Sequence, residues 1–101
     1  MSKTYRLTER AEADVDAITD FIAADNIDAA VKVVLALEDA FVLLASRPGM
    51  GHSRADLTDR PLKFWSVYST LVVYDPASDP LTIVAVLHGA RNVAQLLKEI
   101  G

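Results

Sequence analysis

The chain has 101 residues, of which 51% are hydrophobic and 24% are charged, and it contains no cysteine. This length suffices for one domain, residues 1–101, and the lack of cysteine excludes a disulfide framework or a thiolate metal site. The net charge of −4 excludes direct nucleic-acid binding by bulk charge alone.

The first half of the chain predicts a short strand and two helices. Residues 4–7 are β-compatible, and Thr8 follows as a candidate N-cap. One apolar stripe at helical spacing predicts a helix that stops near residue 24: Ala11, Val15, Ile18 and Ile22. A second, longer stripe predicts a helix that Arg47-Pro48-Gly49 ends: Ala30, Val33, Val34, Leu37, Phe41 and Leu44. So few residues separate the two helices that they should form an antiparallel hairpin. The acidic residues of the first helix are interpreted as a solvated face.

The second half predicts a sheet. Residues 48–61 hold two glycines and two prolines without a period, which indicates a surface loop. The runs LKFWSVYS, TLVVYD and PLTIVAVLHG predict three antiparallel strands in a meander, and residues 92–99 can form a closing helix. The fold class is therefore α+β: an N-terminal strand, a helical hairpin packed on a small, mainly antiparallel sheet, and a short C-terminal helix.

Two histidines raise the question of catalysis. RNA cleavage needs a base, an acid and cations on the phosphate, which His52, His88 and Arg91 could supply, with Arg54, Arg60 or Lys63 as further cations. Under the simpler interpretation, which we favour, His88 hydrogen-bonds the backbone at a corner and His52 is solvated, because the sequence does not bring the two together. No HExxH, CxxC, GxSxG or phosphate-loop motif occurs, so neither a metal nor a cofactor is expected.

The segment after the last strand is more informative. Gly89 follows the strand directly, which predicts a positive φ or a close backbone approach. Arg91 lies near the start of the last helix, where a cation is disfavoured, so we expect it to contact either an acidic side chain of the domain or another molecule. The aromatic residues Trp65, Tyr68 and Tyr74 could stack on bases, but aromatic residues on strands are more often cross-strand core pairs.

Neither a membrane-spanning helix nor a signal peptide is expected from the sequence. No apolar run approaches the ~20 residues of a membrane-spanning helix, and the first residues lack the apolar region of a signal peptide. We therefore expect a cytoplasmic protein without a membrane partner. Its charge is uneven, because residues 1–46 carry four basic and nine acidic side chains, whereas residues 47–101 carry six basic and five acidic ones. The acidic half could meet a basic segment of a partner by charge complementarity.

Several stretches together carry a family resemblance. The stretches LTERAEADVDAITDFIAADN, LLASRPGMG, FWSVYSTLVVYDP and PLTIVAVLHGARN resemble, in this order, the ParE branch of the RelE/ParE toxin superfamily. The resemblance covers nearly the whole chain. It implies a plasmid-stabilisation or related toxin that a ParD-type antitoxin binds and neutralises in a hetero-oligomer. It also implies DNA gyrase as the target, and neither a metal nor a cofactor.

Departures from the related patterns leave two alternatives open. RelE-type ribosome-dependent endoribonucleases carry several basic residues and a tyrosine near the end of the chain, and no tyrosine follows Tyr74 here, which weakens the nuclease alternative. ParE-like members tend to have an aromatic residue where Thr70 stands, arginine where Asp75 and Ala85 stand, and aspartate where Asn92 stands. A weakened or inactive toxin that still binds its antitoxin is the second alternative.

The resemblance and the residue patterns together give two sets of contact candidates. The candidates for the target are Arg91, His88, Asn92, Lys63, Trp65 and Tyr68. The candidates for the antitoxin are the apolar helix positions Val15, Ile18, Ile22, Val34, Leu37 and Phe41. No catalytic residue is expected, and His88, Arg91 and His52 are the candidates only under the nuclease alternative. We also expect that removing the tail from Asn92 onward weakens toxicity more than antitoxin binding.

Overall fold

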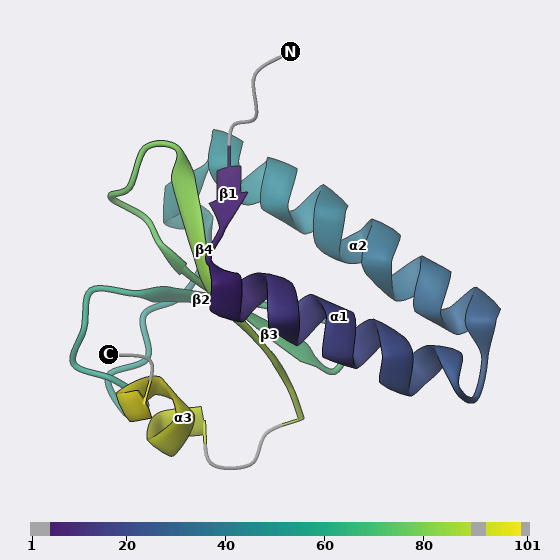
Figure 1. The fold of residues 1–101 in the computed structure, drawn as a ribbon. Coiled ribbons are helices and arrows are strands. Elements are labelled where there is room, and N and C mark those ends of the chain that lie inside the picture. The colour runs from purple at the N-terminus through teal and green to yellow at the C-terminus, as the bar shows by residue number, and fades with distance from the viewer. Residues whose placement is uncertain (1–4, 90–92, 100–101) are drawn as a thin grey trace.

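A computed structural model describes residues 5–89 and 93–99. The elements follow one another as β1 (Tyr5–Leu7), α1 (Glu9–Ala23), α2 (Ile27–Ser46), a 3-10 turn η1 (Pro48–Met50), β2 (Lys63–Val67), β3 (Thr70–Asp75), β4 (Leu81–His88) and α3 (Val93–Glu99). The long helices lie together on one side of the sheet and α3 lies at the other (Figure 1). The predicted α+β fold class is confirmed.

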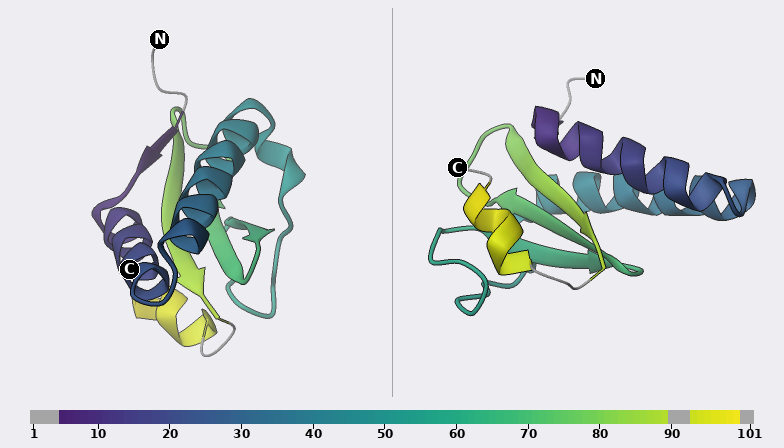
Figure 2. Two further views of the ribbon diagram at one scale, coloured as in Figure 1. Left: turned by 90° about the vertical axis from the view of Figure 1, so that its right-hand side faces the viewer. Right: turned by 60° about the horizontal axis from the view of Figure 1, so that its bottom comes forward.

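Side-chain caps set where both long helices begin. The Thr8 hydroxyl accepts a hydrogen bond from the Ala11 backbone N–H at 3.1 Å, and the Asn26 side chain accepts one from the Ala29 N–H at 3.0 Å. Only residues 24–26 separate α1 from α2. The chain must therefore reverse at once, and the helices form the predicted antiparallel hairpin (Figure 2).

The sheet has the strand order β1-β4-β3-β2. The pairs β2–β3 and β3–β4 are antiparallel, as the predicted meander requires, while β1 pairs with β4 in parallel. The register shifts between Val73, which pairs with Ala85, and Tyr74, which pairs with Ile83. Val84 is thus an extra residue in β4, a bulge that the alternation of side chains alone did not predict.

Two apolar cores cover the two faces of the sheet. The larger lies under the helical hairpin and includes Leu37, Phe41, Leu44, Val72, Tyr74 and Ile83. The smaller lies under α3 and includes Phe64, Val73, Val84, Ala85, Val93 and Leu97. Since the bulge turns both Val84 and Ala85 toward the second face, it enlarges the surface on which α3 packs.

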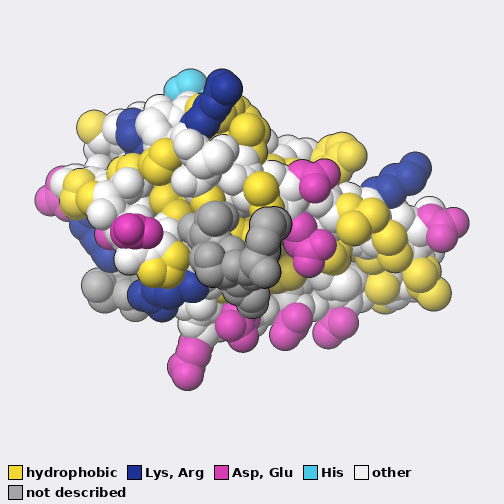
Figure 3. All heavy atoms as spheres, turned by 90° about the horizontal axis from the view of Figure 1, so that it is seen from above, with side chains coloured by type: hydrophobic (Ala, Val, Ile, Leu, Met, Phe, Trp, Pro, Cys, Tyr) yellow, Lys and Arg dark blue, Asp and Glu magenta, His cyan; other side chains and the backbone are white. Residues whose placement is uncertain are grey.

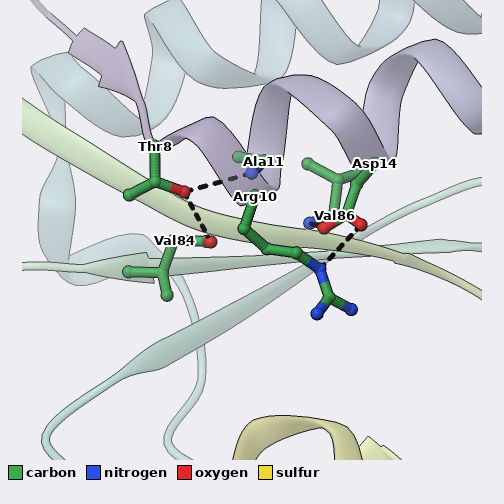
Figure 4. A network of polar contacts seen from close by, with 6 residues as sticks. All are labelled: Thr8, Arg10, Ala11, Asp14, Val84 and Val86. Atoms are coloured by element: carbon green, nitrogen blue, oxygen red, sulfur yellow. Dashed lines mark hydrogen bonds and ion pairs between the residues drawn. The ribbon is translucent and has the colours of Figure 1, made fainter. Parts of the chain in front are cut away.

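The start of α1 continues the sheet where β1 ends. The Thr8 N–H donates to the Ile83 carbonyl at 3.1 Å, and its hydroxyl donates to the Val84 carbonyl at 2.9 Å. Six residues later the Asp14 carboxylate accepts a hydrogen bond from the Val86 N–H at 3.0 Å (Figure 4). These contacts satisfy backbone groups along an edge of β4 that β1 does not reach. The interpretation of the acidic residues of α1 as a solvated face is therefore wrong for Asp14.

Candidate partner-binding surfaces

The two histidines lie far apart. His52 precedes β2 and forms an isolated antiparallel β-bridge with Phe64 of that strand. Its ring stacks on that of Trp65, with 6.5 Å between the ring centroids. His88 ends β4 and pairs with Thr70 of β3. Since β2 and β3 lie between them, the separation across the sheet is about 14 Å, and the register adds about 10 Å along the strands. His52 and His88 therefore cannot serve as base and acid on one phosphate in this arrangement.

The His88 ring lies beside the exposed ring of Phe21. Its ring centroid is 5.9 Å from that of Phe21 near the end of α1. The chain turns at Gly89, whose φ of +82° confirms the predicted positive value, and the Gly89 N–H donates to the Ser69 carbonyl at 3.1 Å. This bond places the β2–β3 turn beside the end of β4.

The β2–β3 turn presents Tyr68. This side chain is 71% exposed, and its backbone has a φ of +54°, in the left-handed region that tyrosine rarely adopts. Beside it lies a hollow of about 370 Å³ between the turn, Gly89 and Val93. A strained, exposed aromatic residue on the edge of a hollow is a candidate recognition element, and a side chain held at such a local cost calls for a functional explanation.

Arg54 lies on the rim of the same hollow. Its guanidinium makes a bidentate pair with Asp56, through Nε at 2.9 Å and Nη2 at 2.8 Å. The hydrogen bond to Asp56 raises the pKa of Arg54, and the hydrogen bond from Arg54 lowers the pKa of Asp56. Because the pair is neutral as a unit, Arg54 contributes little net positive charge to the rim.

The remaining target candidates do not form one surface. Lys63 and Tyr68 flank opposite ends of β2, and the half-buried Trp65 packs against the core under the hairpin. Tyr74, which the sequence left open as a stacking residue, is completely buried. Arg91 and Asn92 lie outside the described residues. Within the described part of the chain, the structure brings His88 next to Phe21, which the sequence did not single out, and places Tyr68 on the turn beside the end of β4.

The antitoxin candidates divide into buried and accessible positions. Ile18, Leu37 and Phe41 have 6%, 1% and 3% of their surface exposed, so the expectation that they meet a partner directly is corrected. They form the domain's own core because the hairpin uses this stripe to cover the sheet. Val15 and Val34 are half-buried and line a groove of about 240 Å³ between β1 and the hairpin, with Arg6, Glu12 and Glu38 among its polar lining residues. Ile22 lines a separate hollow at the end of the hairpin beside Phe21.

The sequence reading missed an apolar stripe on the outer face of α2. Four of its side chains are more than half exposed: Ile27 at 70%, Val31 at 51%, Leu35 at 55% and Val42 at 55%. Their spacings of four, four and seven residues align them on one face of the helix. This second period is present in the sequence, but the buried stripe alone is enough to predict the helix, so the sequence gives no separate reason to expect an exposed stripe.

Two further features are absent from the described residues. Residues 5–89 and 93–99 contain no group of three or more potential metal-ligating side chains. In the same ranges, no helix combines the length and apolarity required to cross a bilayer.

The chain is similar to known proteins in both sequence and structure. A family model described as the ParE toxin of the type II toxin–antitoxin system parDE matches residues 5–93. A solved structure described as the chromosomal ParDE TA system from P. aeruginosa superposes with a TM-score of 0.67. It shares 18% sequence identity, and the superposition covers 85% of this chain and 95% of the other. No curated protein sequence matches the chain.

Proposed function

Because the chain belongs to the ParE toxin family, as its match over residues 5–93 shows, we propose that it inhibits DNA gyrase by binding it and that a ParD-type antitoxin neutralises it. The family match carries this proposal. The chain is the toxin component of a ParDE-type system, and the identity of its target follows from what the family resemblance implies. The proposed mode of action is adhesion between proteins, without a covalent step.

The position of the histidines supports binding over RNA cleavage. An endoribonuclease of the RelE kind would need acid, base and cations within reach of one phosphate. His52 and His88 are separated by β2 and β3, and the exposed Arg54 is already paired with Asp56. By contrast, exposed aromatic rings next to a hollow are typical of surfaces that anchor a protein partner.

We place the target contact at the end of the molecule that carries His88 and Tyr68. Gly89 turns the chain there, and Arg91 follows two residues later in the sequence. The antitoxin contact is assigned to the groove between β1 and the hairpin, where Val15 and Val34 offer apolar surface and Glu12 and Glu38 carry charge. The proposed target contact and the proposed antitoxin contact lie on different elements. The two partners therefore do not need to bind the same surface.

One pair of assays tests this function. The purified chain is added to a gyrase supercoiling reaction and, in parallel, to a cell-free translation reaction. We expect loss of supercoiling with unimpaired translation, and restoration of supercoiling when a ParD-type antitoxin encoded beside the toxin is added. Cleavage of messenger RNA on translating ribosomes, lost on His88→Ala, would contradict the proposal.

A weakened toxin is the second candidate, and one position favours it. Ala85 stands where related members tend to have arginine, and it is completely buried under α3. The sheet therefore presents no cation at this point. A weakened toxin predicts antitoxin binding of full strength together with little effect on growth or supercoiling, so the same assays separate the two candidates.

A further inference from the structure

The guanidinium group of Arg60, in the loop before β2, is partly buried without a counter-charge. Its Nη1 is shielded from solvent and has no hydrogen-bond partner among the described residues. The ion pairs within those residues are Arg10–Asp14 and Arg54–Asp56, and Arg60 takes part in neither. A buried charged donor without a partner destabilises a fold, so such an atom is explained most simply by a ligand that binds beside it.

Arg60 lines a hollow of about 320 Å³ between the loop before β2 and α3. This volume lies at the lower end of the range of about 300–1,000 Å³ that is typical of small-ligand pockets. The exposed side chain of Lys98 supplies a second cation, and Leu57 and Leu97 supply apolar wall. Thr58 adds a hydroxyl, which accepts a hydrogen bond from the Arg60 backbone N–H at 3.1 Å and can donate its own proton to a ligand.

The charges that face the hollow favour an anion. Of the two carboxylates in its lining, Asp56 is already paired with Arg54, and Asp59 is exposed, so that water and salt screen its charge. Arg60 and Lys98 therefore set two positive charges against one negative charge. The hairpin is less suited to an anion, because acidic side chains gather along it on the face that Figure 3 shows.

From the buried guanidinium and the cationic hollow, we propose that the protein binds the phosphate group of a small molecule between the loop before β2 and α3. The phosphate offsets the charge of Arg60 through the part of that side chain that lines the hollow, and Lys98 and Thr58 supply further donors. Three donor side chains match the three terminal oxygens of a phosphate better than the two oxygens of a carboxylate.

The bound phosphate undergoes no covalent step. Neither His52 nor His88 lines the hollow, so no imidazole is placed to act as acid or base on a ligand there. The site goes beyond the proposed function, because it depends neither on the antitoxin nor on the identity of the target.

Nuclear magnetic resonance titration of the full chain tests the site. Inorganic phosphate is added at constant ionic strength, with chloride as the reference anion. We expect the backbone amide signals of Thr58, Arg60 and Lys98 to shift and to saturate, while those of α2 stay in place. Adenosine monophosphate is the second probe: tighter binding than inorganic phosphate would assign the site to a phosphate ester, and equal binding would assign it to the free ion.

Matched substitutions locate the phosphate. Arg60→Met removes the charge and keeps an apolar stem, so affinity for phosphate should fall at least about tenfold. Lys98→Met should lower it about threefold to fivefold, since the ammonium is exposed. Lys32→Met, which removes a cation from α2, is the control and should leave affinity unchanged.

Stability without phosphate gives an independent readout. Burial of an unpaired charge is less favourable than burial of an apolar chain, so Arg60→Met should be at least as stable as the original protein in chloride. Urea denaturation measures this comparison. A large loss of stability in Arg60→Met would show that the guanidinium has a partner within the protein, and the proposal would be wrong.

Two binding results would also overturn the proposal. Shifts that never saturate, or that are equal in Arg60→Met, would reveal only the general effect of phosphate as a salt. Unchanged affinity in Lys98→Met would place the phosphate elsewhere, and this variant keeps Arg60 intact. Neither gyrase nor antitoxin enters these measurements, so failure here is distinguishable from failure of the proposed function.

Discussion

At the scale of single residues, Tyr74 ties the loop after α2 to the centre of the sheet. Its hydroxyl donates to the Pro48 carbonyl at 2.7 Å and accepts a hydrogen bond from the Gly51 N–H at 2.9 Å. The ring is completely buried, and a Cβ at residue 51 would collide with the hydroxyl. The fold therefore requires glycine at 51 and a hydroxyl at 74 together, although 23 residues separate them.

Removing the Tyr74 hydroxyl should destabilise the domain. In Tyr74→Phe the Gly51 N–H and the Pro48 carbonyl lose their partner in a buried place, which costs about 1–3 kcal/mol of unfolding free energy. Urea denaturation followed by circular dichroism measures the change. Tyr68→Phe serves as the control, because that side chain is exposed. Equal stability of the two variants would show that the buried hydroxyl does not hold the loop.

The same hydroxyl should shape the response to alkaline pH. Burial raises the pKa of Tyr74 above its ordinary value of 10.0. The unfolded chain then loses this proton at a lower pH than the folded chain, so the stabilisation is complete below pH 10.0 and is lost as pH rises above it. We expect unfolding free energy to fall as pH rises above 10.0, and to fall less steeply in Tyr74→Phe. Parallel pH profiles for the two proteins would contradict the prediction.

Substitution of Tyr68 should raise the stability of the domain and lower its inhibition of the target. A φ of +54° suits asparagine or glycine better than tyrosine, so Tyr68→Asn should raise the unfolding free energy by about 0.5–1 kcal/mol. If the exposed ring anchors the target, the same variant inhibits gyrase less. Urea denaturation and a supercoiling assay measure the two quantities on one preparation. A more stable variant with undiminished inhibition would remove Tyr68 from the target surface.

At the scale of elements, α1 acts as a substitute strand. β1 has only three residues and leaves the rest of the β4 edge open. Thr8 and Asp14 occupy that edge with side-chain and backbone hydrogen bonds, and Arg10 holds the Asp14 carboxylate at 2.8 Å. An open strand edge invites pairing with other chains, so this arrangement also protects the monomer from aggregation.

Asp14→Ala should therefore loosen the join between α1 and β4. The Val86 N–H loses its acceptor and Arg10 loses its partner, which together cost about 1–3 kcal/mol. Hydrogen exchange at the Val86 amide should accelerate along with the drop in unfolding free energy. Asp16→Ala is the matched control, since Asp16 is an exposed carboxylate of the same helix. Unchanged exchange at Val86 in Asp14→Ala would show that water replaces the carboxylate without loss.

Helices and strands were predictable here because their signals are local. Stripes at helical spacing, the caps at Thr8 and Asn26, and short turns between strand-forming runs determine the order of elements. The bulge at Val84, the bond from Asp14 to Val86 and the tether at Tyr74 arise from tertiary contacts between distant segments. No sequence period encodes them. The antitoxin candidates were partly misplaced for a related reason, because the same apolar stripe can face either a partner or the domain's own sheet.

Burial of α3 determines how the function of the C-terminal tail should be tested. Val93 and Leu97 of α3 are 6% and 2% exposed and pack with Phe64, Val73 and Leu87. Truncation from Asn92 onward, expected from sequence to affect toxicity selectively, would uncover this second core and destabilise the whole domain. Substitution of single residues is the better way to examine the function of the tail.

At the scale of the whole molecule, the two halves of the chain that carry the proposed partner surfaces differ in charge. Acidic residues concentrate in residues 1–46, which include both long helices, whereas residues 47–101 carry a net charge of +1. An antitoxin that engages the hairpin therefore meets a different electrostatic environment from a target that engages the end with Tyr68 and His88. This separation predicts that the two activities respond to different substitutions.

Arg91→Ala and Val34→Thr should separate these activities. Removing the Arg91 guanidinium deletes a proposed target contact, so growth inhibition should fall about tenfold or more while antitoxin binding persists. Val34→Thr places a hydroxyl in the groove between β1 and the hairpin, so antitoxin binding should weaken about fivefold to tenfold while toxicity without antitoxin persists. Growth after induction and pull-down with the antitoxin measure the two effects, with thermal denaturation as the folding control. If each well-folded variant loses both activities in equal measure, the antitoxin and the target share one surface, and the division proposed between groove and sheet end is wrong.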